Sequence, residues 1–272
     1  MIKIRSNIRQ IIETIILLVG TRLISAYLIR ELDLFREYFL KNINSIDQLL
    51  LLFIMDSGDN AIIIGTFLII LYFIVRYNRD YIMNQNNFYH NYPYCWYWYC
   101  RNILGIKRCN LVLVPIYMQF KLVINHLFDA YPLSDDDYPE SEDEEECKVT
   151  KFNFTNDNRE INLILEDTYL IQEFQIPPNK QQLPTIKISR NNGDNMERRF
   201  SQRFINAVIT EVKNIPNIAR INIYATTNPK NTLNIAQRVF KNANRGNIEH
   251  LYVYQQENTG NRNFKSDEHK IY

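Results

Sequence analysis

The sequence predicts two N-terminal transmembrane helices followed by a cytoplasmic α/β domain with a mostly parallel sheet. The first observation is an uncharged apolar run over residues 61–75, which ends at Arg76. A helix of that length, at about 1.5 Å per residue, spans roughly 23 Å and approaches a bilayer crossing. The second is a regular alternation of strand and helix patterns after residue 160. Strands joined by helices at these lengths are typical of a parallel sheet with helices on its faces.

The first membrane span is predicted over residues 11–29. It carries Glu13 and Arg22, and an ionisable group in lipid is costly unless it faces protein or water. The two residues are nine positions apart and therefore lie on opposite sides of a helix, about 180° apart. Either one or both of them line a water-filled path after oligomerisation, or Glu13 lies at the interface and Arg22 snorkels.

The distribution of basic residues predicts a two-pass protein of the inner cell membrane with both termini in the cytoplasm. The segments before the first span and after the second are basic, through Lys3, Arg5, Arg9, Arg76 and Arg79. The loop between the spans has three bases and six acids. A cleaved signal peptide is not expected, because no small-residue cleavage site follows Ile29.

Between the two spans, residues 31–55 mix charged and apolar positions. They predict an amphipathic helix on the outer membrane surface, or an early start of the second span that is broken at residues 56–59. We therefore assign residues 1–80 to a two-helix transmembrane module.

Residues 81–130 are predicted to form an aromatic juxtamembrane segment and the first layer of the soluble domain. Tyr, Trp and Phe crowd residues 88–100, which favours the membrane interface or a packed collar. A nucleic-acid stacking platform is the alternative, but bases are sparse there, and we expect no nucleic acid duplex as a partner. Residues 111–128 continue as an apolar strand or helix pair interrupted by Pro115.

The remainder of the chain divides into an acidic stretch and a basic domain. Residues 131–147 hold nine acids and no base, so we expect a disordered acidic loop. Residues 148–272, the predicted α/β domain, hold 18 Lys/Arg against 12 Asp/Glu, a net charge of +6. A basic domain behind an acidic tether favours an anionic partner.

The α/β pattern places strands and helices in alternation. Apolar runs predict strands at residues 161–165, 186–189, 221–225 and 251–254, and helical spacing predicts a helix from about residue 200 to 212. A further helix has Asn228 as its N-cap, Pro229 at its first position and Gly246 after its last turn.

A phosphate-recognising turn is predicted at the start of that helix. Open parallel sheets bind ligands at the carboxyl ends of their strands, and a helix N-terminus favours an anion. Threonine hydroxyls and a lysine charge add to this turn, and a second strand end lies nearby in the predicted sheet. The predicted ligand-binding residues are Arg190, Asn191, Thr226, Thr227, Asn228 and Lys230. Alternatively, the turn only caps a helix.

Motifs for catalysis are sparse, so we expect that the protein is not an enzyme and that it binds no cofactor or metal. Glycine-rich dinucleotide loops, Walker loops and Gly-x-Ser-x-Gly elbows are absent from the sequence. Glu166 and Asp167 form the one paired-carboxylate feature, which leaves a hydrolase as an alternative. The cysteines contain no Cys-x-x-Cys pair, so reduced cytoplasmic thiols are expected and a zinc site is the alternative, at Cys95, Cys100, Cys109 and Cys147.

Residues 221–254 run strand, Thr-Thr-Asn-Pro turn, helix and strand. This pattern resembles the last strand–helix–strand unit of SAVED and CARF-like Rossmann sensor domains, which bind cyclic oligonucleotides in bacterial antiphage systems. Some of those sensors are joined to two-transmembrane modules, in the order seen here. A small-residue–Gly pair frequent in the sensor helix is replaced by Ala236-Gln237.

The resemblance implies a two-transmembrane effector of antiviral defence. Residues 148–272 would be a sensor for a phosphate-bearing ligand, such as a cyclic nucleotide, and ligand binding would drive assembly of the helices and membrane permeabilisation. A homo-oligomer in a lipid bilayer is implied. The alternatives are a non-gating membrane-anchored scaffold that recruits a partner through its basic face, and the hydrolase based on Glu166 and Asp167.

Overall fold

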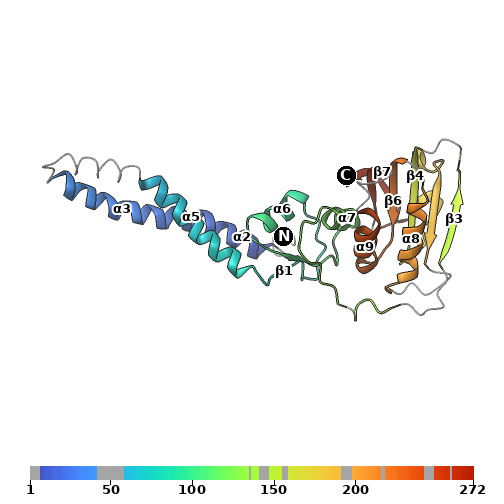
Figure 1. Ribbon diagram of the computed structural model, residues 1–272, viewed down its shortest axis with the longest axis horizontal. Coiled ribbons are helices and arrows are strands. Elements are labelled where there is room, and N and C mark those ends of the chain that lie inside the picture. The colour runs from blue at the N-terminus through green and yellow to red at the C-terminus, as the bar shows by residue number, and fades with distance from the viewer. Residues whose placement is uncertain are drawn as a thin grey trace. The chain divides into compact units, whose positions relative to one another are not determined.

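The chain divides into two structural units, which are drawn in Figure 1. Unit 1 comprises Met1–Phe88 and Cys95–Lys107, and unit 2 comprises Tyr89–Tyr94 and Arg108–Tyr272. The computed structural model describes residues 7–41, 58–134, 136–140, 147–154, 159–190, 198–215, 218–241, 248–257 and 259–272.

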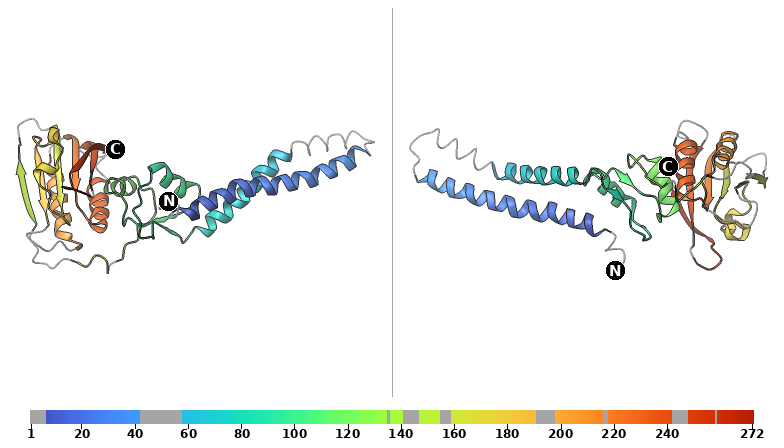
Figure 2. Two further views of the ribbon diagram at one scale, coloured as in Figure 1. Left: turned by 180° about the vertical axis from the view of Figure 1, so that it is seen from behind. Right: turned by 90° about the horizontal axis from the view of Figure 1, so that it is seen from below.

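Two long helices dominate unit 1, and both views of Figure 2 show them side by side. The first is continuous through α2 (Ile8–Ile15), the π-helical turn η1 (Ile16–Gly20) and α3 (Thr21–Leu40), and the second is α5 (Gly58–Tyr77). The stretches Ile8–Tyr38 and Gly58–Tyr77 are long and apolar enough to cross a membrane.

The first helix is longer than the predicted span. Residues 31–40, expected in a separate amphipathic segment, continue the same helix. At this distal end, Arg36 pairs with Asp33 on its own helix and with Asp59 on α5, both at 2.8 Å. The rest of the predicted segment, residues 42–57, lies outside the described residues.

The aromatic segment of unit 1 packs against the end of α5. β1 (Ile82–Met83) is followed by α6 (Tyr94–Asn102), in which Tyr97 and Cys100 are fully buried. Gly105 follows with φ +72°, and a Cβ built on it would come within 2.7 Å of Val75 Cγ1. Glycine is therefore required for this close approach to the second long helix.

The core of unit 2 is a six-stranded mixed sheet. The predicted strands are confirmed at its centre, where four strands run parallel, whereas both edge strands are antiparallel and were not predicted. The order is β3 (Lys148–Phe152), β5 (Thr185–Ser189), β4 (Glu160–Glu166), β6 (Ile218–Ala225), β7 (Ile248–Gln256) and β8 (Phe264–Lys270).

Three helices cover one face of this sheet, and the last of them contacts each of the other two (Figure 1). They are α7 (Ile116–Ile124), α8 (Gln202–Lys213) and α9 (Pro229–Ile235), which continues into the π-helical turn η4 (Ala236–Phe240). The expected strand or helix pair over residues 111–128 is α7, which begins directly after Pro115 and is preceded by β2 (Arg108–Cys109).

The other face of the sheet is covered differently. The connection from β4 to β5 contains the short 3-10 helices η2 (Glu173–Gln175) and η3 (Pro178–Lys180). It supplies Ile171 and Ile176 to a cluster with Ile164, Tyr224, Tyr254 and Phe264. Because β4 leads to β5 on one side whereas β5–α8–β6 and β6–α9–β7 move to the other, right-handed crossovers place them on opposite faces.

Candidate functional site

The connections leave β4 and β6 in opposite directions, although these two strands are neighbours in the sheet. β4 leads to β5 on one side, and β6 leads to β7 on the other. Such a reversal leaves a crevice beyond the carboxyl ends of the two strands, and in open α/β sheets this crevice is the usual ligand site. The candidate site is therefore fixed by topology before any side chain is considered.

A cleft of about 240 Å³ lies at this point. We call it the switch-point cleft. It is lined by the segments that follow β4 and β6, by the end of β7 and by the start of α7, with Tyr89, Val112, Leu113, Val114, Pro115, Ile116, Gln119, Tyr138, Thr168, Tyr169, Arg198, Ala225, Thr226, Thr227, Asn228, Pro229, Gln255 and Gln256.

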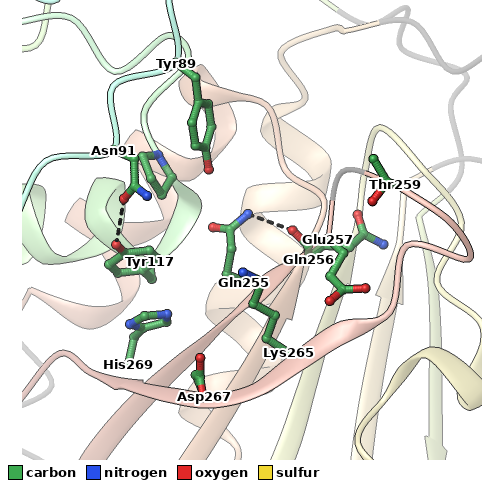
Figure 3. A pocket seen from close by; sticks show the side chains of 11 residues that line it. Tyr89, Asn91, Tyr117, Gln255, Gln256, Glu257, Thr259, Lys265, Asp267 and His269 are labelled. Carbon is green, nitrogen blue, oxygen red and sulfur yellow. Dashed lines mark hydrogen bonds between the residues drawn. The ribbon is translucent and has the colours of Figure 1, made fainter. Parts of the chain in front are cut away.

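A second pocket of about 370 Å³ adjoins the cleft and shares Tyr89, Pro115, Gln255 and Gln256 with it. Figure 3 shows its side chains. The Tyr117 and His269 rings stack with centroids 3.6 Å apart, and Tyr117 Oη donates to Asn91 Oδ1 at 3.3 Å. Burial and nearby lysines lower the pKa of His269, which favours the neutral imidazole.

The carboxylate of Asp167 occupies the turn at the start of α9, where an anionic ligand was expected. Asp167, which follows β4 and is 2% exposed, accepts hydrogen bonds at Oδ2 from Asn228 N and Asn228 Nδ2, both at 3.0 Å. Asn231 Nδ2 donates to the same oxygen at 2.9 Å, and Arg190 Nε pairs with Oδ1. Burial raises the pKa of Asp167, while Arg190 and these N–H donors oppose that shift.

Three of the predicted ligand residues lie in the wall of the cleft. Thr226 Oγ1 donates to Tyr169 O at 2.8 Å and accepts from the N–H of Asp167 at 3.2 Å. Thr227 Oγ1 is 2.7 Å from Thr232 Oγ1. Asn228 caps α9, with its Oδ1 accepting from Asn231 N at 2.9 Å. Their polar side chains hold the loops of the switch point together.

The other predicted ligand residues are placed elsewhere. Lys230 contacts Tyr138 O at 3.5 Å and lies 4.8 Å from the Phe200 ring centroid, and neither Lys230 nor Arg190 is part of the cleft lining. Asn191 lies outside the described residues.

Sequence reasoning missed several residues of the cleft wall, namely Gln119, Tyr138, Tyr169 and Arg198, whereas Gln255 and Gln256 were expected at a strand end of the site. Tyr138 belongs to the acidic stretch that was expected to be disordered, yet it is 2% exposed. Burial raises the pKa of its hydroxyl, and Arg198, which also lines the cleft, opposes that shift. No local pattern distinguishes these residues, because they come together only through tertiary packing.

The paired carboxylates have structural partners. Glu166 Oε1 accepts from Ser189 Oγ, and Glu166 Oε2 accepts from Ile171 N, both at 2.6 Å. Lys187 Nζ lies 2.6 Å from Glu166 Oε2. Across the described part of the chain, no group of three or more His, Cys, Asp or Glu side chains is arranged to hold a metal ion.

The ionisable residues of the first long helix have different surroundings. Glu13 is 6% exposed, and its oxygens accept from Arg9 Nε and Asn78 Nδ2, both at 2.8 Å. Asn78 also donates to Leu104 O at 2.9 Å, so Glu13 links the first helix to the end of the second. Arg22, by contrast, is exposed on the outer surface of the helix pair.

Comparison with known proteins gives one family. The model of the SMODS- and Ubiquitin system-associated 2TM effector domain (SUa-2TM) matches residues 2–272. No curated protein matches the chain. The predicted resemblance to two-transmembrane effectors is confirmed by this match.

Similar solved structures include Acinetobacter baumannii Cap4, a SAVED/CARF-domain receptor, with the cyclic trinucleotides 2′3′3′-cAAA and 3′3′3′-cAAA. The identity is 12% in both cases, the TM-scores are 0.40 and 0.39, and 65% and 63% of this chain is covered. This chain matches 41% of the length of each receptor.

Proposed function

We propose that this chain, which belongs to the SUa-2TM effector domain family, is a membrane-anchored sensor and effector. Its α/β unit binds a phosphate-bearing small ligand, for which cyclic nucleotides are the candidates. Ligand binding drives assembly of the long helices and permeabilises the inner membrane. The observation that supports the proposal is a cleft at a topological switch point, in the same chain as two helices of membrane-spanning length.

The composition of the cleft supports a ligand with both charge and ring surface. Arg198 is the cationic side chain of its lining, and Tyr89 and Tyr169 supply aromatic walls. A guanidinium recognises phosphate through several hydrogen bonds, and an aromatic ring stacks on a base. Thr226, Thr227 and Asn228 keep their predicted role in the wall of this cleft, whereas Lys230 and Arg190 lie outside its lining, and for Asn191 the predicted role remains a proposal from sequence.

The surface of the long helices supports a membrane location. Large apolar side chains point outward along both helices, including Leu23 at 66% exposure and Phe73 at 62%. A soluble protein rarely exposes a continuous apolar surface of this extent, whereas lipid requires it. The basic flanks of the two spans favour a cytoplasmic location of both termini under the positive-inside rule.

Arg22 supports assembly in the membrane. An arginine at the middle of a lipid-facing helix costs about 2.5–3.5 kcal/mol on insertion scales. Packing of several copies around Arg22 would remove the guanidinium from lipid and place it at a water-filled path. Glu13 does not line this path, because its carboxylate is hydrogen-bonded to Arg9 and Asn78 within the protomer. For a full switch, the ligand must favour the assembled state by about 5.5 kcal/mol.

The test uses the full chain in lipid nanodiscs and in dye-loaded liposomes. Isothermal titration against cyclic di- and trinucleotides should give saturable binding, and the same ligand should release dye. Arg198→Ala should reduce affinity about tenfold, and Arg203→Ala, an exposed arginine on α8, should leave it unchanged. No binding by the wild type would refute the sensor. Binding without dye release would favour the non-gating scaffold, and ligand hydrolysis that requires Glu166 would favour the hydrolase.

A further inference from the structure

Two amide groups in the wall of the switch-point cleft have unused hydrogen-bonding capacity. Gln119, on α7, is 5% exposed, and its Nε2 donates to Val114 O at 2.8 Å. That bond fixes the orientation of the amide, because a flipped amide would set two oxygens against each other. Gln119 Oε1 has no hydrogen-bond partner among the residues that the structure describes.

Gln256, at the end of β7, presents the complementary group. Its Nε2 is buried and has no hydrogen-bond partner within the described ranges of the chain. Both Gln119 and Gln256 line the switch-point cleft. One side chain therefore has an unused acceptor and the other an unused donor, at the walls of one cavity.

Such groups need a partner. A buried polar atom without a hydrogen bond destabilises the folded state, and native proteins contain few of them outside functional sites. Neighbouring hydrogen bonds fix the loops around the cleft, including the Thr226 bonds to Tyr169 and Asp167. A ligand entering the cleft is the group best placed to satisfy both amides after a small side-chain adjustment.

The chemistry of that ligand follows from the rest of the wall. Tyr89 is 45% exposed, so its ring surface is available beside the two amides, whereas the Arg262 guanidinium lies 4.1 Å from the centroid of the half-buried Tyr169 ring. A nucleobase combines a flat face for stacking with an edge that carries both a donor and an acceptor. A phosphate or a metal ion has no ring face, and a metal ion or a phosphodiester has no hydrogen-bond donor.

We propose that Gln119 and Gln256 are the base-reading residues of the cleft. Gln119 Oε1 accepts an N–H from the edge of the base, and Gln256 Nε2 donates to a ring nitrogen or carbonyl of the same base. This assignment rests on the proposed function and deepens it, because it specifies a nucleotide whose base enters the cleft and whose phosphate lies toward Arg198.

The experiment compares ligands with and without a base on the full chain in nanodiscs. The probes are cyclic dinucleotides and trinucleotides of A, G, C and U, with ribose 5-phosphate as the base-free probe. Gln119→Met and Gln256→Met keep side-chain length and remove the amide. Each should weaken binding of the preferred cyclic nucleotide about tenfold and leave ribose 5-phosphate unchanged. Gln237→Met, an exposed glutamine on η4, is the matched control.

The results distinguish base reading by the two glutamines from ligand binding by the cleft. Equal losses for both kinds of probe, or no loss with either variant, would overturn base reading while the sensor function stands. No binding of any probe by the wild type would overturn the sensor itself. Gln256→Met keeps the test decisive if Gln119→Met fails to fold, because Gln256 lies half-buried at a strand end rather than inside α7.

Discussion

Replacing Asp167 by asparagine should destabilise unit 2 by about 3–5 kcal/mol, the usual cost of removing one partner from a buried ion pair. The side chain keeps its shape and loses the charge that faces Arg190, which is itself 3% exposed. The new amide also presents N–H groups where the carboxylate now accepts from Asn228 and Asn231. The structure therefore predicts an effect near the upper end of this range.

For a domain of 150–250 residues, each kcal/mol corresponds to roughly 2–4 °C in Tm, so the expected decrease is about 6–20 °C. The assay is thermal unfolding of the full chain in detergent, followed by intrinsic tyrosine and tryptophan fluorescence. Asp167→Asn combined with Arg190→Met should be more stable than Asp167→Asn alone, because no buried charge then loses its counter-charge. Glu249→Gln, an exposed carboxylate on β7, is the control. Equal Tm values for Asp167→Asn and Glu249→Gln would refute the structural role of Asp167.

Three further predictions follow from other parts of the molecule. Gly105→Ala should lower Tm, because its φ is +72° and the new Cβ would meet Val75, and adding Val75→Ala should restore part of the loss in the same melting assay. Burial raises the pKa of Glu160 and Glu268, but neighbouring amide, hydroxyl and cationic groups hold both below the usual value. Stabilisation from these two carboxylates is therefore complete above about pH 4.5 and is lost as pH falls through the folded pKa, so Tm of the wild type should decrease with acidification more than that of a Glu160→Gln, Glu268→Gln variant. Arg22→Leu should preserve cyclic nucleotide binding and abolish ligand-dependent dye release; full release by this variant would remove Arg22 from the proposed path.

The central strands could be predicted from sequence because strands buried on both faces are nearly continuous apolar runs. The two edge strands could not be predicted in this way. β3 contains Lys148 and Lys151, and β8 contains Lys265, Asp267 and Lys270, because exposed edges of sheets carry charge that discourages aggregation. Their patterns therefore resemble those of loops.

The α9 N-cap was similarly predictable, because Asn228-Pro229 is a local signal. The carboxylate that occupies this turn could not be predicted, because Asp167 precedes Asn228 by 61 residues and reaches it only through the pairing of β4 with β6. The same limit applies to Gln119, whose unused acceptor exists only because α7 packs beside the switch point. Local sequence therefore predicts the elements, and tertiary packing decides which polar groups remain available to a ligand.

The length of the first long helix affects how it fits into a bilayer. The helix Ile8–Tyr38 contains 31 residues, which at about 1.5 Å per residue is roughly 46 Å, against about 30 Å for the hydrocarbon core of a bilayer, and its distal end carries the charged residues Arg30, Glu31, Asp33, Arg36 and Glu37. The excess must be accommodated by tilt, by thickening of the surrounding lipid or by projection of the Asp33–Arg36–Asp59 end beyond the membrane. Tilt and thickening each cost a fraction of a kcal/mol per Å, so acyl-chain length acts on the same equilibrium as the ligand wherever the two states of the helices differ in tilt. Thicker bilayers should therefore change how much ligand is needed, without any change in the cleft.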